Sequence, residues 1–304
     1  MTLRSLLASL GLLTLVVMTA ACQRRSDPSG EASGKPPAAE AKTIQIIGSD
    51  TMVNLAQAWA EKYHAVAPAI SVEVSGGGSG VGIAALENGT ADIANASREV
   101  KPDEKAKIEK KSGHPLREVT VGHDALAIYV HKDNPLDTIS VEELSELYRE
   151  NGSISKWSQL GVTAIPGGQG DEVIRVSRQN SSGTYAYFRE HVLGKEADFR
   201  SGTLDMNGSK EVVELISKTP GAIGYSGMGY LTAGVKQLKV SRKKGEPGVA
   251  PSVAATLDRT YPIARALYMY LPGDPPPHVQ QYLDWILSPA GQAIVKETGY
   301  VPVK

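Results

Sequence analysis

Most of the information in this 304-residue chain lies in two stretches, Ser75-Gly76-Gly77-Gly78-Ser79-Gly80-Val81-Gly82 and Arg178-Gln179-Asn180-Ser181-Ser182-Gly183-Thr184. Each combines hydroxyl residues with glycines where a strand-like run gives way to a helix-like run. Such a junction exposes backbone N–H groups at the positive end of the helix dipole, which favours an anion. Two such junctions, far apart in the chain, predict an anion held between two lobes.

The remaining sequence alternates between strand-like and helix-like segments. Apolar and β-branched runs predict strands over residues 43–47, 70–74, 91–94, 116–130, 172–177, 222–225, 235–240 and 263–271. Helical periodicity and end signals predict helices over residues 51–65, 80–88, 102–111, 141–150, 184–192, 210–218, 277–286 and 289–297. Repeated strand–helix units predict an α/β protein whose sheet is largely parallel and carries helices on both faces.

Composition narrows the classes of function. Hydrophobic residues make up 41% and charged residues 21% of the chain, which suits a globular protein with a large core. The formal net charge of −1 argues against a nucleic-acid partner and requires an anion site built from local donors. The histidines show no metal-ligand spacing and no nucleophile-elbow pattern occurs, so we predict no cofactor, no metal and no catalytic residue.

The N-terminal sequence has the pattern of a targeting segment. Arg4 precedes an apolar run over residues 6–17, and Thr19-Ala20-Ala21 leads into Cys22, the only cysteine. This pattern resembles a bacterial lipobox, which implies a lipoprotein signal peptide over residues 1–21, cleavage before Cys22 and lipid on its thiol. The alternative is an ordinary secretory signal with an incidental cysteine. Residues 22–42 have the composition of a flexible tether, so we predict a protein of the cell envelope, anchored to a membrane on its periplasmic or extracellular face.

Five ordered blocks resemble the periplasmic phosphate-binding proteins of bacterial ABC phosphate importers. They are Ile47-Gly48-Ser49-Asp50-Thr51, residues 75–82, Asp92-Ile93-Ala94-Asn95-Ala96-Ser97-Arg98, residues 178–184 and Pro220-Gly221-Ala222-Ile223-Gly224-Tyr225. The resemblance runs over residues 43–303 and implies a two-lobed, type II-like periplasmic-binding-protein fold, with mixed or parallel sheets flanked by helices and a hinge. It implies lobe one over residues 43–128 and 266–304, lobe two over 129–265, and crossings near 128–131 and 263–267.

The same resemblance implies a function. The lobes would close over inorganic phosphate, and the closed protein would deliver it to ABC permease subunits in the inner membrane. Such a protein is expected to be a monomer without enzymatic activity. Sulfate or another tetrahedral oxyanion is an alternative cargo. A phosphatase or phosphoryl-transfer enzyme is an alternative of another class, disfavoured because the motifs contain no Asp/His metal cluster.

Candidate site residues lie where predicted strands end. The resemblance implies phosphate-binding roles for Thr51, Met52, Arg178, Ser182, Gly183 and Thr184. Position and chemistry add Ser49 beside the first predicted helix, Ser79 and Gly80 at the start of the second, and Ser97 and Arg98 after the third strand. The alternatives are an N-cap for Ser49, a simple glycine turn at residues 75–82, and a solvated surface arginine for Arg178.

Arg98 departs from one branch of the family, which has Asp at this position. An arginine raises the positive charge of the site and cannot accept the proton of hydrogen phosphate. Asp124, near the predicted crossing, is the candidate proton acceptor. Its alternative role is that of a turn or hinge residue which bonds to its own backbone.

Overall fold

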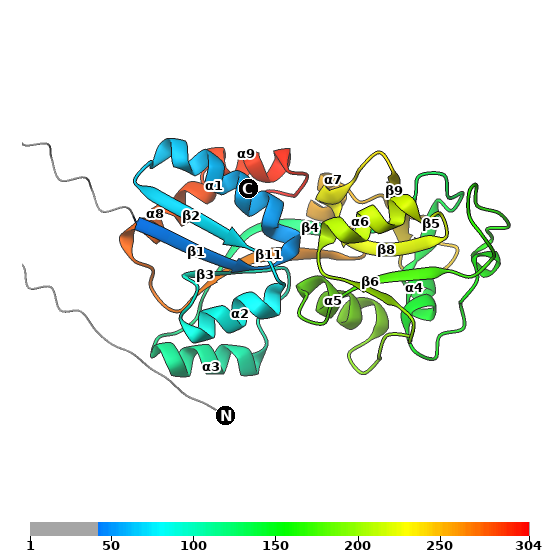
Figure 1. Cartoon of the computed structure of the whole chain (residues 1–304), viewed down its shortest axis with the longest axis horizontal. Helices are drawn as coiled ribbons and strands as arrows, with labels where there is room; N and C mark the ends of the chain where they lie inside the picture. The colour runs from blue at the N-terminus through cyan, green and yellow to red at the C-terminus, as the bar shows by residue number, and fades with distance from the viewer. Residues whose placement is uncertain (1–41, 304) are drawn as a thin grey trace, which may run out of the picture. The chain divides into compact units, whose positions relative to one another are not determined.

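The computed structural model describes residues 42–303, so the predicted signal peptide, Cys22 and nearly all of the predicted tether lie outside it. Figure 1 shows the elements in chain order. The strands are β1 (Lys42–Gly48), β2 (Ile70–Ser75), β3 (Ile93–Ala96), β4 (Arg117–His131), β5 (Thr138–Ser140), β6 (Ile174–Arg178), β7 (Leu204–Met206), β8 (Ala222–Gly227), β9 (Val235–Gln237), β10 (Lys239–Ser241) and β11 (Ala264–Leu271).

The α-helices are α1 (Val53–Val66), α2 (Ser79–Asn88), α3 (Pro102–Ser112), α4 (Val141–Tyr148), α5 (Gly183–Phe188), α6 (Ser209–Lys218), α7 (Val253–Leu257), α8 (Pro277–Ile286) and α9 (Pro289–Glu297). Short 3-10 turns η1 (Asp50–Met52), η2 (Trp157–Leu160) and η4 (Met228–Tyr230) and a π-turn η3 (Arg189–Leu193) complete the described elements. The predicted strands and helices are present in this order, with two differences. The segment over residues 235–240 forms two short strands, β9 and β10, in different sheets, and the helix over residues 184–192 is α5 continued by the π-helical turn η3. The three-residue strands β5 and β7 and the short helix α7 were not predicted.

The first half of the sheet has the order β2-β1-β3-β11-β4. β1 pairs in parallel with β2 and with β3, so the carboxyl ends of these three strands meet at one edge. β11 returns from late in the chain and inserts antiparallel between β3 and β4. Helices α1, α8 and α9 gather on one face, and α2 and α3 lie on the other (Figure 1).

The second half of the sheet continues through the same strand β4. Residues up to Ala125 pair with β11, and residues from Leu126 onward pair with β8 and β9. The long segment is therefore one continuous strand that exchanges partners slightly earlier than the crossing predicted near residues 128–131. Beyond β8 follow β6 and β7, both parallel to their neighbours, with β6 leading directly into the turn before α5.

The sheet is mixed, and the expectation of a largely parallel sheet is wrong at its centre. The pairings of β11 and β4 with their neighbours are antiparallel, whereas the outer pairings are parallel. The reason is that β4 and β11 run between the two halves in opposite directions, once outward and once back. Strand direction of this kind depends on where a distant segment returns, which local periodicity does not record.

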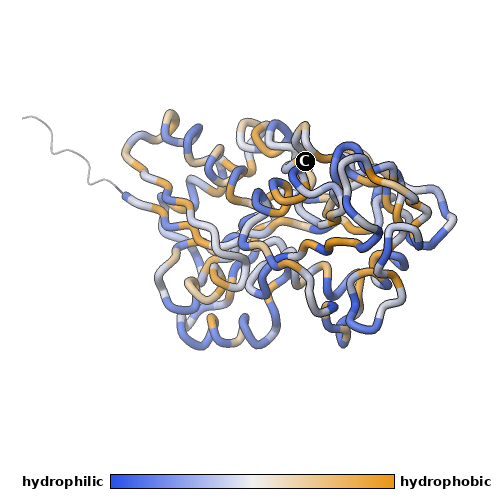
Figure 2. The backbone as a smooth tube through the Cα atoms, turned by 45° about the vertical axis from the view of Figure 1, so that its right-hand side comes forward, coloured by the Kyte–Doolittle hydropathy of each residue, from blue (hydrophilic) through white to orange (hydrophobic). Residues whose placement is uncertain are grey.

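Apolar side chains fill the space between sheet and helices. Trp59 and Tyr63 of α1 are fully buried against the α8–α9 pair, and Trp59 Nε1 donates to the carbonyl of Gly291 at 2.8 Å. In the second half, Phe188 stacks on Tyr225 with ring centroids 3.9 Å apart. In Figure 2, hydrophobic residues (orange) lie along the central strands, and hydrophilic residues (blue) lie along many outer loops. None of the helices within residues 42–303 has the length and apolar character needed to span a bilayer.

Candidate anion-binding site

Four hydroxyl residues gather at the carboxyl edge of β1, β2 and β3. Ser49 and Thr51 follow β1, Ser79 begins α2 after β2, and Ser97 follows β3, and all four are buried. Ser49 Oγ donates to Ser97 Oγ at 2.9 Å, and the N–H of Ser97 donates to Ser79 Oγ at 3.0 Å. The parallel register of the three strands explains this convergence, because their ends lie side by side. The structure thus brings together four of the predicted site residues.

The second predicted motif forms the turn between β6 and α5. Arg178 ends β6, and Ser182, Gly183 and Thr184 begin α5. Ser182 is the N-cap residue, and its hydroxyl oxygen accepts hydrogen bonds from the N–H groups of Thr184 at 3.1 Å and Tyr185 at 3.4 Å. The hydroxyl proton of Ser182 is not used in those two bonds. The local sequence explains the geometry, because serine at a helix start satisfies N–H groups that the helix itself cannot.

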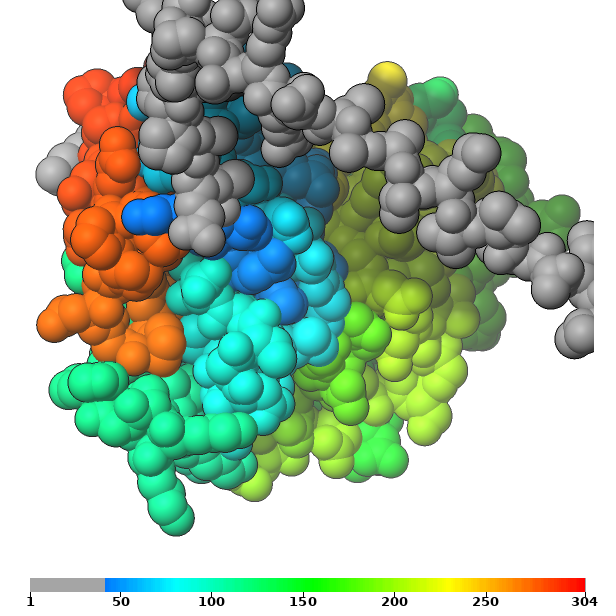
Figure 3. All heavy atoms as spheres, turned by 60° about the vertical axis from the view of Figure 1, so that its left-hand side comes forward, coloured from blue at the N-terminus to red at the C-terminus, as the bar shows by residue number. Residues whose placement is uncertain are grey.

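The two motifs meet directly. Thr51 Oγ1 and Thr184 Oγ1 lie 2.8 Å apart, and the N–H of Gly80 donates to the carbonyl of Ser181 at 2.9 Å. A Cβ atom added at Gly183 would lie only 2.2 Å from Ser79 Oγ. In the space-filling view of Figure 3, cyan atoms of the chain near residue 80 lie against green atoms of the chain near residue 180. Residues roughly a hundred positions apart therefore form one polar cluster.

Arg178 is fully buried beside this cluster. Its Nη2 donates to Asp50 Oδ2 at 2.9 Å and to the carbonyl of Asn207 at 3.0 Å, while Nη1 donates to Ser209 Oγ at 3.0 Å. Burial lowers the pKa of the guanidinium, and the charge of Asp50 opposes this effect. Within residues 42–303, Arg178 Nε is buried and has no hydrogen-bond partner. A buried donor without a partner costs free energy, which an anion at this position would recover.

A second buried arginine, Arg265 on β11, reaches the same cluster. Its Nη2 lies 3.1 Å from Thr184 Oγ1 and 3.3 Å from Thr51 Oγ1, and its Nη1 donates to the carbonyl of Ser97 at 3.1 Å. From the sequence, Arg265 was expected only as part of the strand over residues 263–271. The missed signal was the arginine itself, since a charged residue inside an apolar strand requires a specific partner.

Asp124 is that partner. Its Oδ2 accepts from Arg265 Nε at 3.1 Å and Nη2 at 2.8 Å, and its Oδ1 accepts from the N–H of Met228 at 3.1 Å. Burial raises the pKa of the Asp124 carboxyl, while Arg265 and the Met228 N–H oppose that rise. The carboxylate therefore contacts the cluster through Arg265. Its role as proton acceptor stays a prediction.

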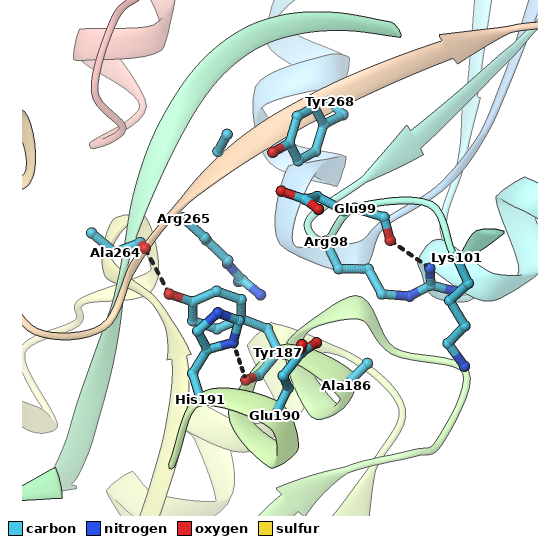
Figure 4. A pocket seen from close by; sticks show the side chains of 11 residues that line it. Arg98, Glu99, Lys101, Ala186, Tyr187, Glu190, His191, Ala264, Arg265 and Tyr268 are labelled. Carbon is cyan, nitrogen blue, oxygen red and sulfur yellow. Dashed lines mark hydrogen bonds between the residues drawn. The ribbon is translucent and has the colours of Figure 1, made fainter. Parts of the chain in front are cut away.

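Arg98 extends away from the hydroxyl cluster. Its guanidinium makes a fork-like pair with Glu104 of α3, at 2.8 Å from Nη1 to Oε2 and 2.7 Å from Nη2 to Oε1, and Nη1 also donates to the carbonyl of Glu99. Arg98 lines a cavity of about 330 Å³ together with Arg265 and Tyr187. Figure 4 shows these side chains around it. Glu104, which no sequence motif marks, is the competing partner of Arg98.

Two predicted backbone donors also have protein partners. The N–H of Met52 donates to the carbonyl of Ser49 at 2.9 Å within η1, and the N–H of Gly80 donates to Ser181. The 3-10 turn at η1 accounts for the first bond. The second bond joins the two motifs. In this conformation, therefore, neither group is directed at a ligand position.

The chain is similar to several characterised proteins. Residues 33–290 match the PBP superfamily domain. The chain is 37% identical to the phosphate-binding protein PstS of Pseudomonas aeruginosa, covering 86% of this chain and 83% of that protein. It is 31% identical to the phosphate-binding protein PstS of Bacillus subtilis, covering 95% of this chain and 90% of that protein.

Solved structures show the same similarity. A Clostridium perfringens protein, described as a phosphate ABC transporter substrate-binding protein with bound phosphate, superposes with a TM-score of 0.76 at 27% identity over 86% of this chain and 100% of that chain. An ABC-type phosphate transport receptor from Vibrio cholerae superposes with a TM-score of 0.66 at 26% identity, over 85% and 99% of the two chains. The predicted two-lobed α/β fold with mixed sheets and flanking helices is confirmed.

Proposed function

Because the chain belongs to the PBP superfamily, and within it to the family of the phosphate-binding protein PstS, we propose that it binds inorganic phosphate between two lobes outside the cytoplasm. It then delivers the phosphate to the permease of an ABC importer. The proposal assigns residues 43–128 and 266–304 to lobe one and residues 129–265 to lobe two, and takes the protein to act as a monomer.

One observation carries this proposal: hydroxyl groups from both motifs meet beside two buried guanidinium groups. Each guanidinium faces a carboxylate, Arg178 facing Asp50 and Arg265 facing Asp124, at 2.9 and 2.8 Å. Hydroxyl and guanidinium groups are the donors that a tetrahedral oxyanion accepts from, and burial strengthens each bond. The proposed phosphate donors are Ser49, Thr51, Met52, Ser79, Gly80, Ser97, Arg98, Arg178, Ser182, Gly183 and Thr184. Arg98, Met52 and Gly80 would have to exchange their present partners for the anion. The same holds for Ser49, whose hydroxyl now donates to Ser97 Oγ.

Calorimetric titration of the purified protein with phosphate, sulfate and arsenate tests the function. We expect saturable binding of one phosphate per chain, with arsenate competing because its shape and protonation are similar. Sulfate should compete poorly, since hydrogen phosphate carries a proton that a buried acceptor can receive and sulfate carries none. If sulfate binds as tightly as phosphate, the protein is an oxyanion receptor of broader range and the phosphate assignment falls.

Asp124→Asn should weaken the discrimination against sulfate. The substitution removes the charge that neutralises Arg265, so the site gains net positive charge and favours a fully ionised anion. We expect the affinity ratio of phosphate to sulfate to fall by about tenfold, equivalent to about 1.4 kcal/mol. Competition of labelled phosphate by sulfate measures the ratio. Asp92→Asn is the matched control. Asp92 lies just before the amino end of β3, away from the carboxyl ends that form the site, and accepts from the N–H of Gln45 at 2.8 Å. An unchanged ratio in Asp124→Asn would assign the acceptor role to another group.

A phosphatase or phosphoryl-transfer activity is the alternative of another class. Such chemistry uses a metal cluster, a general base or a positioned nucleophile. Within residues 42–303, no group of three or more His, Cys, Asp or Glu side chains is arranged to hold a metal ion. Membership of a transport family favours binding without turnover. Incubation with a generic phosphate ester, followed by a measurement of released phosphate, distinguishes the two functions.

We also propose that the protein is anchored to the cell envelope through lipid on Cys22. Cys22 is the only cysteine, so incorporation of labelled fatty acid reports this residue alone. We expect wild-type protein in the membrane fraction, released by detergent, and Cys22→Ser either uncleaved or in the soluble fraction. A lipoprotein that carries more than one acyl chain should bind the membrane stably, whereas a single acyl chain gives only marginal membrane binding. Mature wild-type protein that is soluble and begins at another residue would contradict the anchor.

A further inference from the structure

We propose that Arg265 is a positioning residue of the anion site, which directs the hydroxyl protons of Thr51 and Thr184 toward the bound anion. The inference rests on the proposed phosphate-binding function. It concerns a residue of β11 that no motif in the sequence marked. The three groups form a compact arrangement, with Arg265 Nη2 at 3.3 Å from Thr51 Oγ1 and at 3.1 Å from Thr184 Oγ1.

The two protons on Arg265 Nη2 have different partners. This nitrogen carries two protons, and one of them is directed at Asp124 Oδ2 at 2.8 Å. The other proton is left for the two threonine oxygens, which it reaches as a shared, three-centre hydrogen bond. A guanidinium has no acceptor, so neither hydroxyl can turn its own proton toward Arg265. Each threonine therefore accepts on the arginine side and must donate elsewhere.

The hydroxyl protons of Thr51 and Thr184 have few other acceptors within reach. Thr51 Oγ1 and Thr184 Oγ1 lie 2.8 Å apart, so one proton can bridge them while the other is directed outward. An anion beside the pair can accept both protons at once, because Arg265 continues to occupy a lone pair on each oxygen. The arrangement is thus preorganised for an acceptor, which reduces the cost of reorienting the donors when the ligand binds.

The rest of the side chain is held in place by three further groups. Nε donates to Asp124 Oδ2 at 3.1 Å, Nη1 donates to the carbonyl of Ser97 at 3.1 Å, and the guanidinium carbon lies 5.5 Å from the ring centroid of Tyr187. Figure 4 shows Arg265 extending from β11 toward the Tyr187 ring. Only the planar fork of arginine reaches all these acceptors together, so lysine cannot substitute for it.

The positions of the two threonines link this role to the two halves of the sheet. Thr51 follows β1 and Thr184 lies in α5 after β6, whereas Arg265 belongs to the strand that returns from one half to the other. The guanidinium can contact both hydroxyls only when the two motifs meet. Arg265 therefore orients one donor from each motif in the conformation where the anion contacts both.

A double-mutant cycle tests the proposal. Phosphate affinity is measured by calorimetry for Arg265→Gln in two backgrounds, the natural threonines and the isosteric pair Thr51→Val/Thr184→Val. We expect Arg265→Gln to weaken phosphate binding by about tenfold with the threonines present and by less than about threefold without them, because coupled residues are not additive. Equal losses in both backgrounds would mean that Arg265 contacts the anion itself. No loss in either background would remove Arg265 from the site, and both results overturn the proposal.

Two further measurements keep the test decisive. Arg265→Gln leaves Asp124 buried without its charged partner, so the cycle is repeated with Asp124→Asn in every variant, and thermal unfolding without phosphate confirms that each variant folds. Arg117→Gln is the control variant, because Arg117 lies on neighbouring β4 and donates to Gln280 Oε1 at 2.8 Å, outside the cluster. Wild-type protein that binds no phosphate would overturn the proposed function, whereas an additive cycle in a protein that binds phosphate would overturn this inference alone.

Discussion

Replacing Arg178 with alanine is expected to weaken phosphate binding by roughly 30- to 4000-fold. Truncating one partner of a buried, hydrogen-bonded charge pair costs about 2–5 kcal/mol, and that range of free energy converts to this range of affinity. Arg178 is fully buried beside the hydroxyl cluster. Among the described residues 42–303, its Nε has no hydrogen-bond partner and is free to donate to an anion. Calorimetric titration with phosphate measures the effect.

The control for this prediction is Arg175→Ala on the same strand. Arg175 lies on β6 but outside the hydroxyl cluster, so its removal should leave phosphate affinity close to that of the wild type. Arg178→Ala will also lower the unfolding temperature without phosphate, because Asp50 loses its 2.9 Å ion pair. Stability and affinity are therefore measured separately. Near-wild-type affinity in a folded Arg178→Ala protein would exclude this residue from the site.

Gly183→Ala is expected to lower phosphate affinity by at least about 100-fold, or about 2.7 kcal/mol. The added Cβ would lie 2.2 Å from Ser79 Oγ, 2.8 Å from Ser97 Oγ and 2.9 Å from Ser79 Cβ, so the two motifs could not approach as closely as they do. Helix propensity is not the cause, because alanine stabilises a helix relative to glycine. An anion held by both motifs would lose the contacts from one of them.

Small-angle scattering gives this prediction a second readout. Wild-type protein should become more compact with saturating phosphate, because an anion that contacts both lobes favours the closed state. Gly183→Ala should show little compaction at the same concentration. Gly221→Ala is the matched control, since its added Cβ would meet other atoms only at 3.8 Å and beyond. A Gly183→Ala protein that compacts and binds as the wild type does would show that the close approach at Gly183 is not required.

Much of the fold could be predicted from the sequence because the signals are local. β-branched runs and helix end signals located every long element, and the glycine–serine junctions marked the two turns that meet at the hydroxyl cluster. The antiparallel centre of the sheet could not be predicted in this way, because it depends on where β11 inserts. Strands of three residues, such as β5 and β7, are too short to show a period.

The candidate site was predicted in part for the same reason. Ser49, Thr51, Ser79 and Ser97 follow the ends of β1, β2 and β3, which lie together because these strands are parallel. Ser182 and Thr184 follow β6 in the other half of the sheet, and their meeting with the first motif is a tertiary contact. Arg265 was missed because its partners, Asp124, Thr51 and Thr184, are distant in sequence. Arg98 was assigned to the site by position alone, whereas Glu104 of α3 takes its guanidinium. Side-chain pairing across elements decides these cases, and the chain order of the residues does not indicate it.

The insertion of β11 between β3 and β4 also constrains the order of folding. Most of the second half of the sheet comes from one uninterrupted segment, so it can form once residues up to about β10 are available. The first half cannot complete its hydrogen-bond ladder until residues 264–271 arrive, long after β1, β2 and β3 have been synthesised. Contacts of such high sequence separation form slowly, and unpaired strand edges are prone to aggregate. Until β11 is available the edge of β3 stays unpaired, so we expect a chain truncated before β11 to be insoluble.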